Sequence, residues 1–258
     1  MKSVLAILTG IIVMVNSCSK KDNVKSNAID LRQNTEFADE LEEKGINHNR
    51  PLKPNSVLVT GNPNYKLVPV YKEKLSKDGK YAYIQGNYFH RSYYYDDFGD
   101  GNNWNYHYMP GFEAMYGFNM YNISHYNVEK KEKKLLFENS VLIKTLYYPA
   151  LLTDTLNFEP VKRNYYMVSV YNEDTNNDST INAKDLRRFY HFDIDANTKT
   201  LLIPLNYSVL SSEYDSQNDF MYIFAKLDEN KNGSRDVEEP IHIFLLDLNA
   251  PKLAEQLY

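Results

Sequence analysis

After residue 52 the chain alternates short runs of aromatic and β-branched residues with turns rich in Asn, Asp and Gly. Such runs, bounded by turn-forming residues, predict β-strands. No window in this part has the apolar spacing of a long amphipathic helix. The pattern therefore predicts an all-β fold of antiparallel strands, in one domain over residues 53–258.

One strand–turn–strand pattern occurs three times in this domain. The first two copies align without a gap when Ser124 is matched to Tyr190, and the third needs one inserted residue. The copies lie at Ser124–Phe137, Tyr190–Ile203 and Phe244–Tyr258, and a further strand is predicted before each, at Lys80–Gln85, Tyr166–Tyr171 and Phe220–Ala225. The repeats are thus expected over about 70–137, 164–203 and 218–258.

A short motif adds a family resemblance to this pattern. Residues 76–83 read Ser-Lys-Asp-Gly-Lys-Tyr-Ala-Tyr. They resemble the S-P-D-G-K-x-I-A signature of TolB-like and dipeptidyl-peptidase-like β-propellers, with Lys77 in place of Pro. The resemblance implies three propeller-blade-like repeats. Because propellers usually need about four to eight blades, three copies leave open a stack of blades, a ring completed by a partner, or a β-sandwich of related hairpins.

The N-terminal residues have the pattern of a targeting segment. Residues 1–17 comprise a positive start and the apolar run Val4–Val15, which is too short to span a bilayer comfortably. Cys18 follows where a lipobox places the acylated cysteine, and the segment resembles a bacterial lipoprotein signal. The alternative is a free Cys in an N-terminal membrane helix. The resemblance predicts lipidation of Cys18, a polar tether over 18–52, and anchoring in a bacterial cell envelope at the outer membrane.

Composition excludes some classes of protein. The 258 residues carry a net charge of −5 and are 43% hydrophobic, which argues against a disordered chain and against a nucleic-acid binder. The chain has 23 Tyr and 12 Phe, and these residue types favour strands. The one Cys excludes an intramolecular disulfide.

Two twelve-residue loops match the calcium consensus D-x-[DN]-x-[DN]-G-x5-E, and each starts at the same distance after the strand predicted before it. Positions 1, 3, 5, 9 and 12 are oxygen side chains, and position 7 can offer its carbonyl, which suits a hard cation taking six to eight oxygens. The loops resemble those of EF-hand and dockerin modules and predict Ca²⁺ binding. The residues at positions 1, 3, 5, 7, 9 and 12 are Asp174, Asn176, Asp178, Thr180, Asn182 and Asp185 in loop one, and Asp228, Asn230, Asn232, Ser234, Asp236 and Glu239 in loop two.

The alternative for each loop is a polar hairpin turn. Loop one has Ser179 where the consensus has Gly, and Asp185 where it has the longer Glu. Loop two keeps Gly233 and Glu239 but has Arg235 at a position that is usually apolar. Because Gly makes the turn without strain and Glu can bind with both oxygens, we expect loop two to bind the ion more tightly.

The remaining candidate residues are aromatic or histidine. The segment 88–126 is rich in aromatic residues, and Trp104, Tyr106 and Tyr108 could stack on sugar rings, although filling of the core is the favoured interpretation. His125 and His191 stand at equivalent positions of two copies, which favours a structural role. No motif of a nucleophile, zinc protease or phosphate-binding loop occurs.

These patterns favour a calcium-binding envelope protein that acts as a binding or scaffold module and is not an enzyme. Its partner would be a glycan or another envelope protein. The alternatives are a glycan-binding lipoprotein that uses the aromatic segment and, less favoured, a hydrolase.

Overall fold

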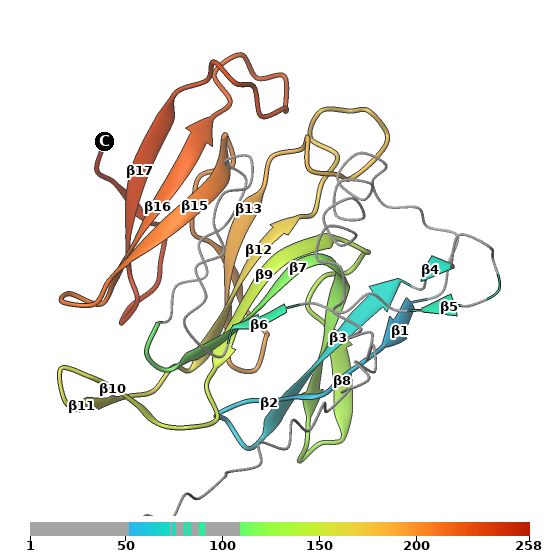
Figure 1. Ribbon diagram of the computed structural model, residues 1–258, viewed down its shortest axis with the longest axis vertical. Coiled ribbons are helices and arrows are strands. Elements are labelled where there is room, and N and C mark those ends of the chain that lie inside the picture. Colours follow the sequence, from blue (N-terminus) through green and yellow to red (C-terminus); the bar gives the residue numbers. More distant parts are fainter. Residues whose placement is uncertain (1–51, 73, 76–79, 81, 84–87, 91–108) are drawn as a thin grey trace, which may run out of the picture.

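A computed structural model describes residues 52–72, 74–75, 80, 82–83, 88–90 and 109–258 (Figure 1). Within these ranges the regular structure consists of β-strands, and all of their pairings are antiparallel, which confirms the expected all-β class. No helix in the described residues is long and apolar enough to cross a membrane. The predicted signal peptide, Cys18 and residues 19–51 of the tether lie outside the described residues.

The strands follow one another in chain order. The first nine are β1 (Leu52–Pro54), β2 (Leu58–Val59), β3 (Tyr65–Lys72), β4 (Lys74–Leu75), β5 (Ala82–Tyr83), β6 (Tyr88–His90), β7 (Phe112–Asn127), β8 (Glu132–Leu135) and β9 (Leu142–Pro149). The next nine are β10 (Asp154–Leu156), β11 (Glu159–Val161), β12 (Tyr165–Tyr171), β13 (Arg188–Asp193), β14 (Lys199–Leu201), β15 (Tyr207–Asp215), β16 (Phe220–Leu227), β17 (Ile241–Asp247) and β18 (Glu255–Gln256).

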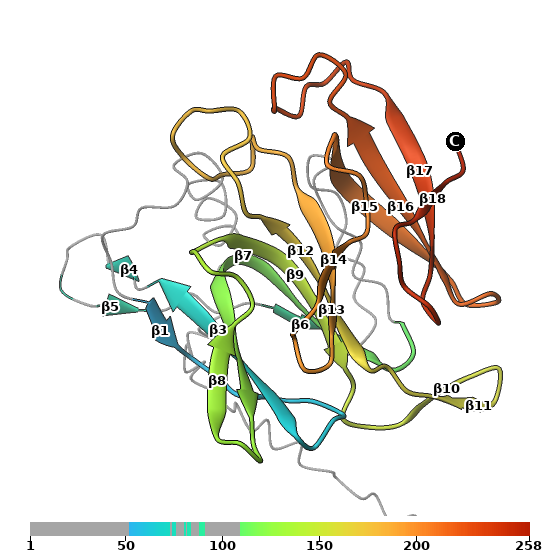
Figure 2. The ribbon, with the colours of Figure 1, turned by 180° about the vertical axis from the view of Figure 1, so that it is seen from behind.

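Two sheets make up most of the domain (Figures 1 and 2). The large sheet has ten strands, in the order β1-β3-β7-β9-β12-β13-β14, with β2, β6 and β8 paired beside this path. The small sheet has four strands in the order β15-β16-β17-β18. Two short hairpins, β4–β5 and β10–β11, stand as separate two-stranded sheets.

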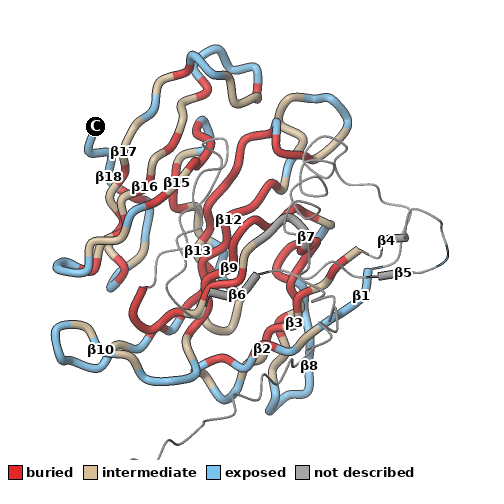
Figure 3. The backbone as a smooth tube through the Cα atoms, viewed as in Figure 1, coloured by how far each residue is buried: buried red, intermediate tan, exposed pale blue. Residues whose placement is uncertain are grey.

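The two sheets pack face to face through one hydrophobic cluster. Met167 and Phe189 of the large sheet and Met221 and Phe244 of the small sheet belong to this cluster. A second cluster, which includes Val168, covers the opposite face of the large sheet. Strands β9 and β12 are buried along their whole length (Figure 3), because both of their faces are covered. This explains their nearly continuous apolar sequence.

The structure contains the three hairpins that the internal repeat predicts. They are β7–β8, β13–β14 and β17–β18. Each pair of residues in the second hairpin has its counterpart in the first hairpin at the offset that aligns Ser124 with Tyr190. In the third hairpin the partner residue comes one position later, because of the inserted residue. The corresponding pairs are Ser124 with Leu135, Tyr190 with Leu201, and Phe244 with Gln256.

The strand predicted before the first copy, at Lys80–Gln85, is present in part among the residues that the structure describes, but it does not pair with the first hairpin. Within Lys80–Gln85 only Ala82 and Tyr83 are described as strand, and they pair with β4. The strand beside the first hairpin is β3, as β12 and β16 are beside the second and third. Residues 73–111 separate β3 from β7, so the sequence pattern does not identify β3 as the neighbour of the first hairpin.

The first two three-stranded units, β3–β7–β8 and β12–β13–β14, share one sheet because β9 pairs with both β7 and β12. In the described part of the chain the strands form neither a ring of blades nor a closed barrel. The described strands form two packed antiparallel sheets, and the three blade-like repeats stay a prediction. The main-chain N–H and C=O groups of β9 connect the first two units, so they do not stand apart as separate blades.

Candidate functional site

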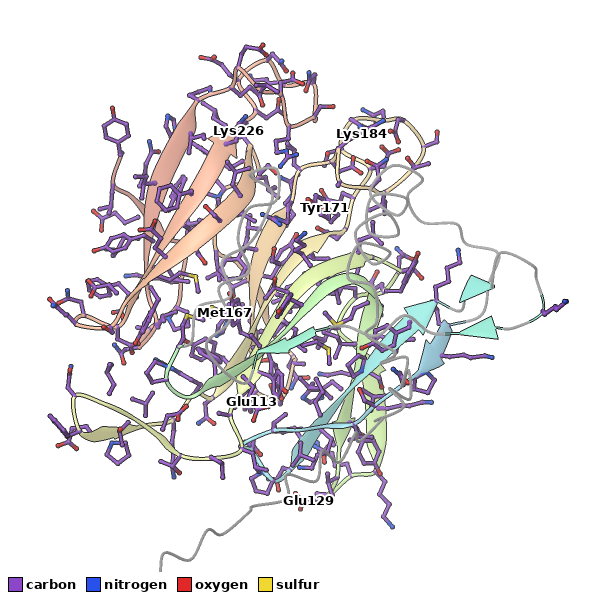
Figure 4. The ribbon with its side chains drawn as sticks, viewed as in Figure 1. Glu113, Glu129, Met167, Tyr171, Lys184 and Lys226 are labelled. Carbon is purple, nitrogen blue, oxygen red and sulfur yellow. The ribbon has the colours of Figure 1, made fainter. Side chains whose placement is uncertain are left out.

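Loop one (residues 174–185) and loop two (residues 228–239) each connect neighbouring antiparallel strands. Loop one joins β12 to β13 in the large sheet, and loop two joins β16 to β17 in the small sheet. Both loops lie at the same end of the molecule, near the labelled residues Lys184 and Lys226 (Figure 4). The hairpin topology therefore holds both ends of each loop close together.

In loop one the side-chain oxygens of positions 1, 3 and 5 accept hydrogen bonds from the backbone ahead of them. Asp174 accepts the N–H of Asp178 at Oδ1 (3.1 Å) and that of Ser179 at Oδ2 (2.9 Å). Asn176 Oδ1 also accepts the Asp178 N–H (3.0 Å), and Asp178 Oδ1 accepts the Thr180 N–H (2.9 Å). These bonds fold the three side chains back over a tight turn.

Loop two has the same four hydrogen bonds at the same positions. Asp228 accepts the N–H of Asn232 at Oδ1 (3.1 Å) and that of Gly233 at Oδ2 (3.1 Å). Asn230 Oδ1 accepts the Asn232 N–H (2.9 Å), and Asn232 Oδ1 accepts the Ser234 N–H (2.7 Å). Two loops from different sheets thus adopt one hydrogen-bonding pattern.

The backbone of the two loops also agrees in its left-handed residues. Position 4 has a φ of 59° in both loops, at Asn177 and Lys231. Position 6 has a φ of 69° at Ser179 and 73° at Gly233. Position 6 is where calcium loops of this consensus use Gly for the sharp turn. Ser179 therefore takes the glycine conformation at a cost in strain that Gly233 does not have.

The acid at position 12 closes each loop by accepting the N–H groups of positions 2 and 9. In loop one both bonds to Asp185 are 2.8 Å long, and this side chain is fully buried. Burial raises the pKa of Asp185, so its ionised form is disfavoured in the folded chain. In loop two the donors to Glu239 are the N–H groups of Glu229 and Asp236, at 3.2 and 3.1 Å.

Other loop carboxylates are held in the ionised form by hydrogen bonds. The hydroxyl of Thr180 donates to Asp178, and this bond lowers the pKa of Asp178. Asp236 Oδ2 accepts the side-chain N–H groups of Asn230 (2.9 Å) and Asn232 (2.7 Å), which lower the pKa of Asp236. Each loop therefore presents negative charge and amide oxygens within a short stretch of chain, which are ligand types that Ca²⁺ prefers.

The donor set is mixed rather than a cage of acids. In the described residues no three or more His, Cys, Asp or Glu side chains are grouped as a metal site. At its ligand positions each loop offers three carboxylates together with amide, hydroxyl and main-chain oxygens, and calcium sites of this length draw on all of these. The residue types therefore fit Ca²⁺ better than Zn²⁺, which prefers His and Cys ligands.

The two loops are in direct contact, which the sequence did not predict. Thr175 Oγ1 donates to the main-chain oxygen of Gly233 (2.6 Å), and the Arg235 N–H donates to the Lys184 oxygen (3.3 Å). A Cβ at position 233 would collide with the main-chain oxygen of Thr175. Gly233, expected only to relieve strain in the turn, is thus also required by the close approach of the other loop.

The remaining predicted site residues belong to the aromatic segment 88–126. Trp104, Tyr106 and Tyr108 lie outside the described residues. Phe112 and Tyr121 of the same aromatic segment are buried in hydrophobic clusters, as the core interpretation predicts.

Comparison with protein-family models yields no match, and no curated protein matches the chain.

Proposed function

We propose that this protein is a membrane-anchored, extracytoplasmic module for binding or scaffolding that holds Ca²⁺ in loops one and two, and that it has no catalytic role. The main support is that two loops from different sheets share one consensus, one set of hydrogen bonds and left-handed residues at positions 4 and 6. The shared positions are those that a calcium loop of this consensus uses for its sharp turn and its oxygen ligands.

The chemistry of the loops gives the ion a stabilising role. The three carboxylates at the ligand positions of each loop repel one another when ionised, and a divalent cation turns this repulsion into attraction. An ion that binds only the folded chain adds about 2.7 kcal/mol to the free energy of unfolding at a hundredfold excess over Kd. Extracellular calcium sites with a Kd of about 10⁻⁴–10⁻³ M are common, so weak binding is sufficient.

Calorimetric titration of the full chain with CaCl₂ after chelation tests this proposal. We expect heat of binding and a rise in Tm with Ca²⁺, and a smaller response in Asp228→Asn and Glu239→Gln than in Asp185→Asn, because loop two is the better site. Asp247→Asn is the matched control, since Asp247 accepts the Asn249 N–H (2.8 Å) in a polar turn outside both loops. The absence of heat, together with a Tm that chelator leaves unchanged, would contradict calcium binding.

The anchor is tested separately at Cys18. We expect Cys18→Ala to give an uncleaved precursor that takes up no label from a fatty-acid analogue. The parent chain should be labelled and should remain on membranes after washing with salt. Equal labelling of the variant and the parent would overturn the lipoprotein part of the proposal.

The repeat belongs to the same proposal. We infer that the units β3–β7–β8, β12–β13–β14 and β16–β17–β18 are copies of one blade-like unit. The shared register of their hairpins supports this origin. Loops one and two occupy the same connection in the second and third copies, between the first and second strands. Duplication therefore explains why two similar loops occur in one chain.

A further inference from the structure

The hairpin β10–β11 carries an aromatic residue in an unfavourable backbone conformation. Leu156 pairs with Glu159, so Asn157 and Phe158 form a two-residue turn, with φ values of 51° and 69°. Turns with positive φ at both residues favour Asn-Gly, because Gly adopts this conformation without strain. Asn157 fits the turn, whereas Phe158 takes the place of the glycine.

Phe158 gains no packing in return for this strain. Its exposed fraction is 98%, so the ring stands in solvent at the tip of the hairpin. Hairpin β10–β11 pairs only with itself among the described strands. A bulky residue that destabilises its own turn and contacts little else in the fold suggests a role in binding something outside the fold.

Further apolar residues lie at the base of this hairpin. Leu151 and Leu152 are 56% and 78% exposed. The segment 61–64 links this base to the turn between β7 and β8: the Gly61 N–H donates to the Pro149 oxygen (3.0 Å), and the Asn64 oxygen accepts the Val128 N–H (2.8 Å). The base of β10–β11 therefore belongs to the same end of the molecule as the turn between β7 and β8.

The turn between β7 and β8 is basic, although the chain as a whole has a net charge of −5. Residues 129–134 contain four lysines and two glutamates, and all six are exposed. Glu129 is labelled in Figure 4 at the end of the molecule opposite loops one and two. The lysines are Lys130, Lys131, Lys133 and Lys134.

We propose that this basal end, formed by residues 128–134 and 149–158, docks onto an anionic lipid bilayer. Phe158, Leu151 and Leu152 enter the interface, and Lys130, Lys131 and Lys133 face the anionic headgroups, whereas Lys134 Nζ donates to Asn197 Oδ1. Apolar insertion combined with basic residues is the chemistry of peripheral membrane binding. A protein partner would need complementary shape, whereas a bilayer needs only protruding apolar groups and positive charge.

The location of this surface near a membrane rests on the proposed lipid anchor. The chain between Cys18 and Leu52 can span at most about 120 Å when fully extended, so the domain stays within that distance of an anchored Cys18. Tethering makes docking an intramolecular event, and weak insertion is then sufficient. The chemistry of the docking surface does not depend on the anchor.

The test places a fluorescent dye at each end of the full chain. Glu159→Cys puts the dye beside Phe158, and Glu238→Cys puts it on an exposed residue of the same type in loop two. The unsubstituted chain, treated with the same dye, reports any reaction at Cys18. Each protein is incorporated into vesicles of phosphatidylcholine and phosphatidylglycerol that contain brominated lipid, which quenches a dye at the bilayer.

We expect the dye at 159 to be quenched several-fold more than the dye at 238. This difference should shrink in vesicles of phosphatidylcholine alone, in Phe158→Gly, and in Lys130→Gln with Lys131→Gln. Equal quenching at the two positions in the anionic vesicles would overturn the proposal and favour a protein as the occupant of this surface.

A salt wash separates this proposal from the lipid anchor. If the protein stays on the vesicles while the dye at 159 is unquenched, the anchor stands and docking is wrong. If the protein leaves the vesicles in high salt but the dye at 159 is quenched in low salt, docking stands and the anchor is wrong. If the protein does not bind the vesicles under either condition, both proposals are wrong.

Discussion

The hydroxyl of Thr175 donates a 2.6 Å hydrogen bond to the main-chain oxygen of Gly233, which joins a loop of the large sheet to a loop of the small sheet. The same hydroxyl accepts the N–H of Leu186 (2.8 Å). The Thr175 side chain thus holds both the end of loop one that leads into β13 and the turn of loop two. This side chain is therefore a direct contact between loop one and loop two.

Thr175→Val should destabilise the protein by about 1–3 kcal/mol. The substitution keeps the shape of the side chain but leaves the Gly233 oxygen and the Leu186 N–H without this partner, and groups of this kind cost about that much when they lose their hydrogen bond. Denaturant unfolding of the full chain measures the effect. Thr153→Val, at an exposed position, is the control and should change little. Equal stabilities would mean that the contact between the loops contributes nothing.

Gly233→Ala and Ser179→Gly should change stability in opposite directions. Both positions have a positive φ, but the new Cβ at 233 would collide with Thr175, whereas Gly at 179 relieves strain. We expect a loss of more than about 1 kcal/mol for the first variant and a gain of up to about 1 kcal/mol for the second. Thermal unfolding of both variants and the parent checks the signs. A stabilising Gly233→Ala would contradict the close approach.

A buried ion pair links the segments that precede β12 and β16. Arg163 donates to both carboxylate oxygens of Asp219, at 2.7 and 2.9 Å, and the two side chains are 3% and 4% exposed. Arg163→Met should cost about 3–5 kcal/mol, because it leaves Asp219 charged, buried and without this partner. Adding Asp219→Asn should restore part of the loss. In chemical unfolding, a double variant whose loss equals the sum of the two single losses would show that the side chains do not interact.

Two histidines should make the protein less stable in acid. Burial lowers the pKa of His125 and of His191 from the usual 6.5. The unfolded chain then binds more protons than the folded chain below this value, so stability that is present above pH 6.5 is lost as the pH falls through the folded pKa values. His125 also lies with Nε2 3.0 Å from the oxygen of Ile194.

The free energy of unfolding, measured at about pH 7.5 and about pH 5.5, checks this prediction. We expect His125→Gln to lose less stability over this range than the parent, whatever its stability at the higher pH. His191→Gln should behave in the same way. If both variants follow the pH dependence of the parent, other groups are responsible for it.

Phe158→Gly should stabilise the protein, although it removes a large apolar side chain. The ring is 98% exposed and its φ is 69°, so the substitution relieves strain and loses little packing. A gain of about 1 kcal/mol is expected. Phe158→Ala is the matched control, because it removes the ring but keeps a Cβ at positive φ. Calorimetric Tm values should rank Gly above Ala, and the reverse order would argue against a strained turn.

Much of the fold could be predicted where the pattern is local. The aromatic and apolar positions of β7–β8 recur in β13–β14 at a constant offset, so the register of the hairpins follows from the repeat. The buried face does not follow from it, because His125 packs against Tyr166 and His191 against Tyr165, which are neighbours on β12 and belong to different hydrophobic clusters. The class of the fold followed from the same alternation of strands and turns.

Contacts between distant segments could not be predicted. The pairing of β3 with β7 spans an insertion of about forty residues, and nothing in the pattern of β3 specifies its partner. The loop residues could be identified because each loop carries its oxygen side chains at consensus positions within twelve neighbouring residues. The contact of Thr175 with Gly233 depends on how two sheets pack, which no local pattern encodes.

Strand β9 has a consequence for how the chain avoids self-association. It belongs to neither of the first two units, yet it pairs with the part of β7 that β8 leaves uncovered and, on its other side, with β12. Without it, each unit would expose an open row of N–H and C=O groups beside apolar residues, a template for pairing with other chains. A strand outside the first two units thus covers the edges that these units would otherwise expose.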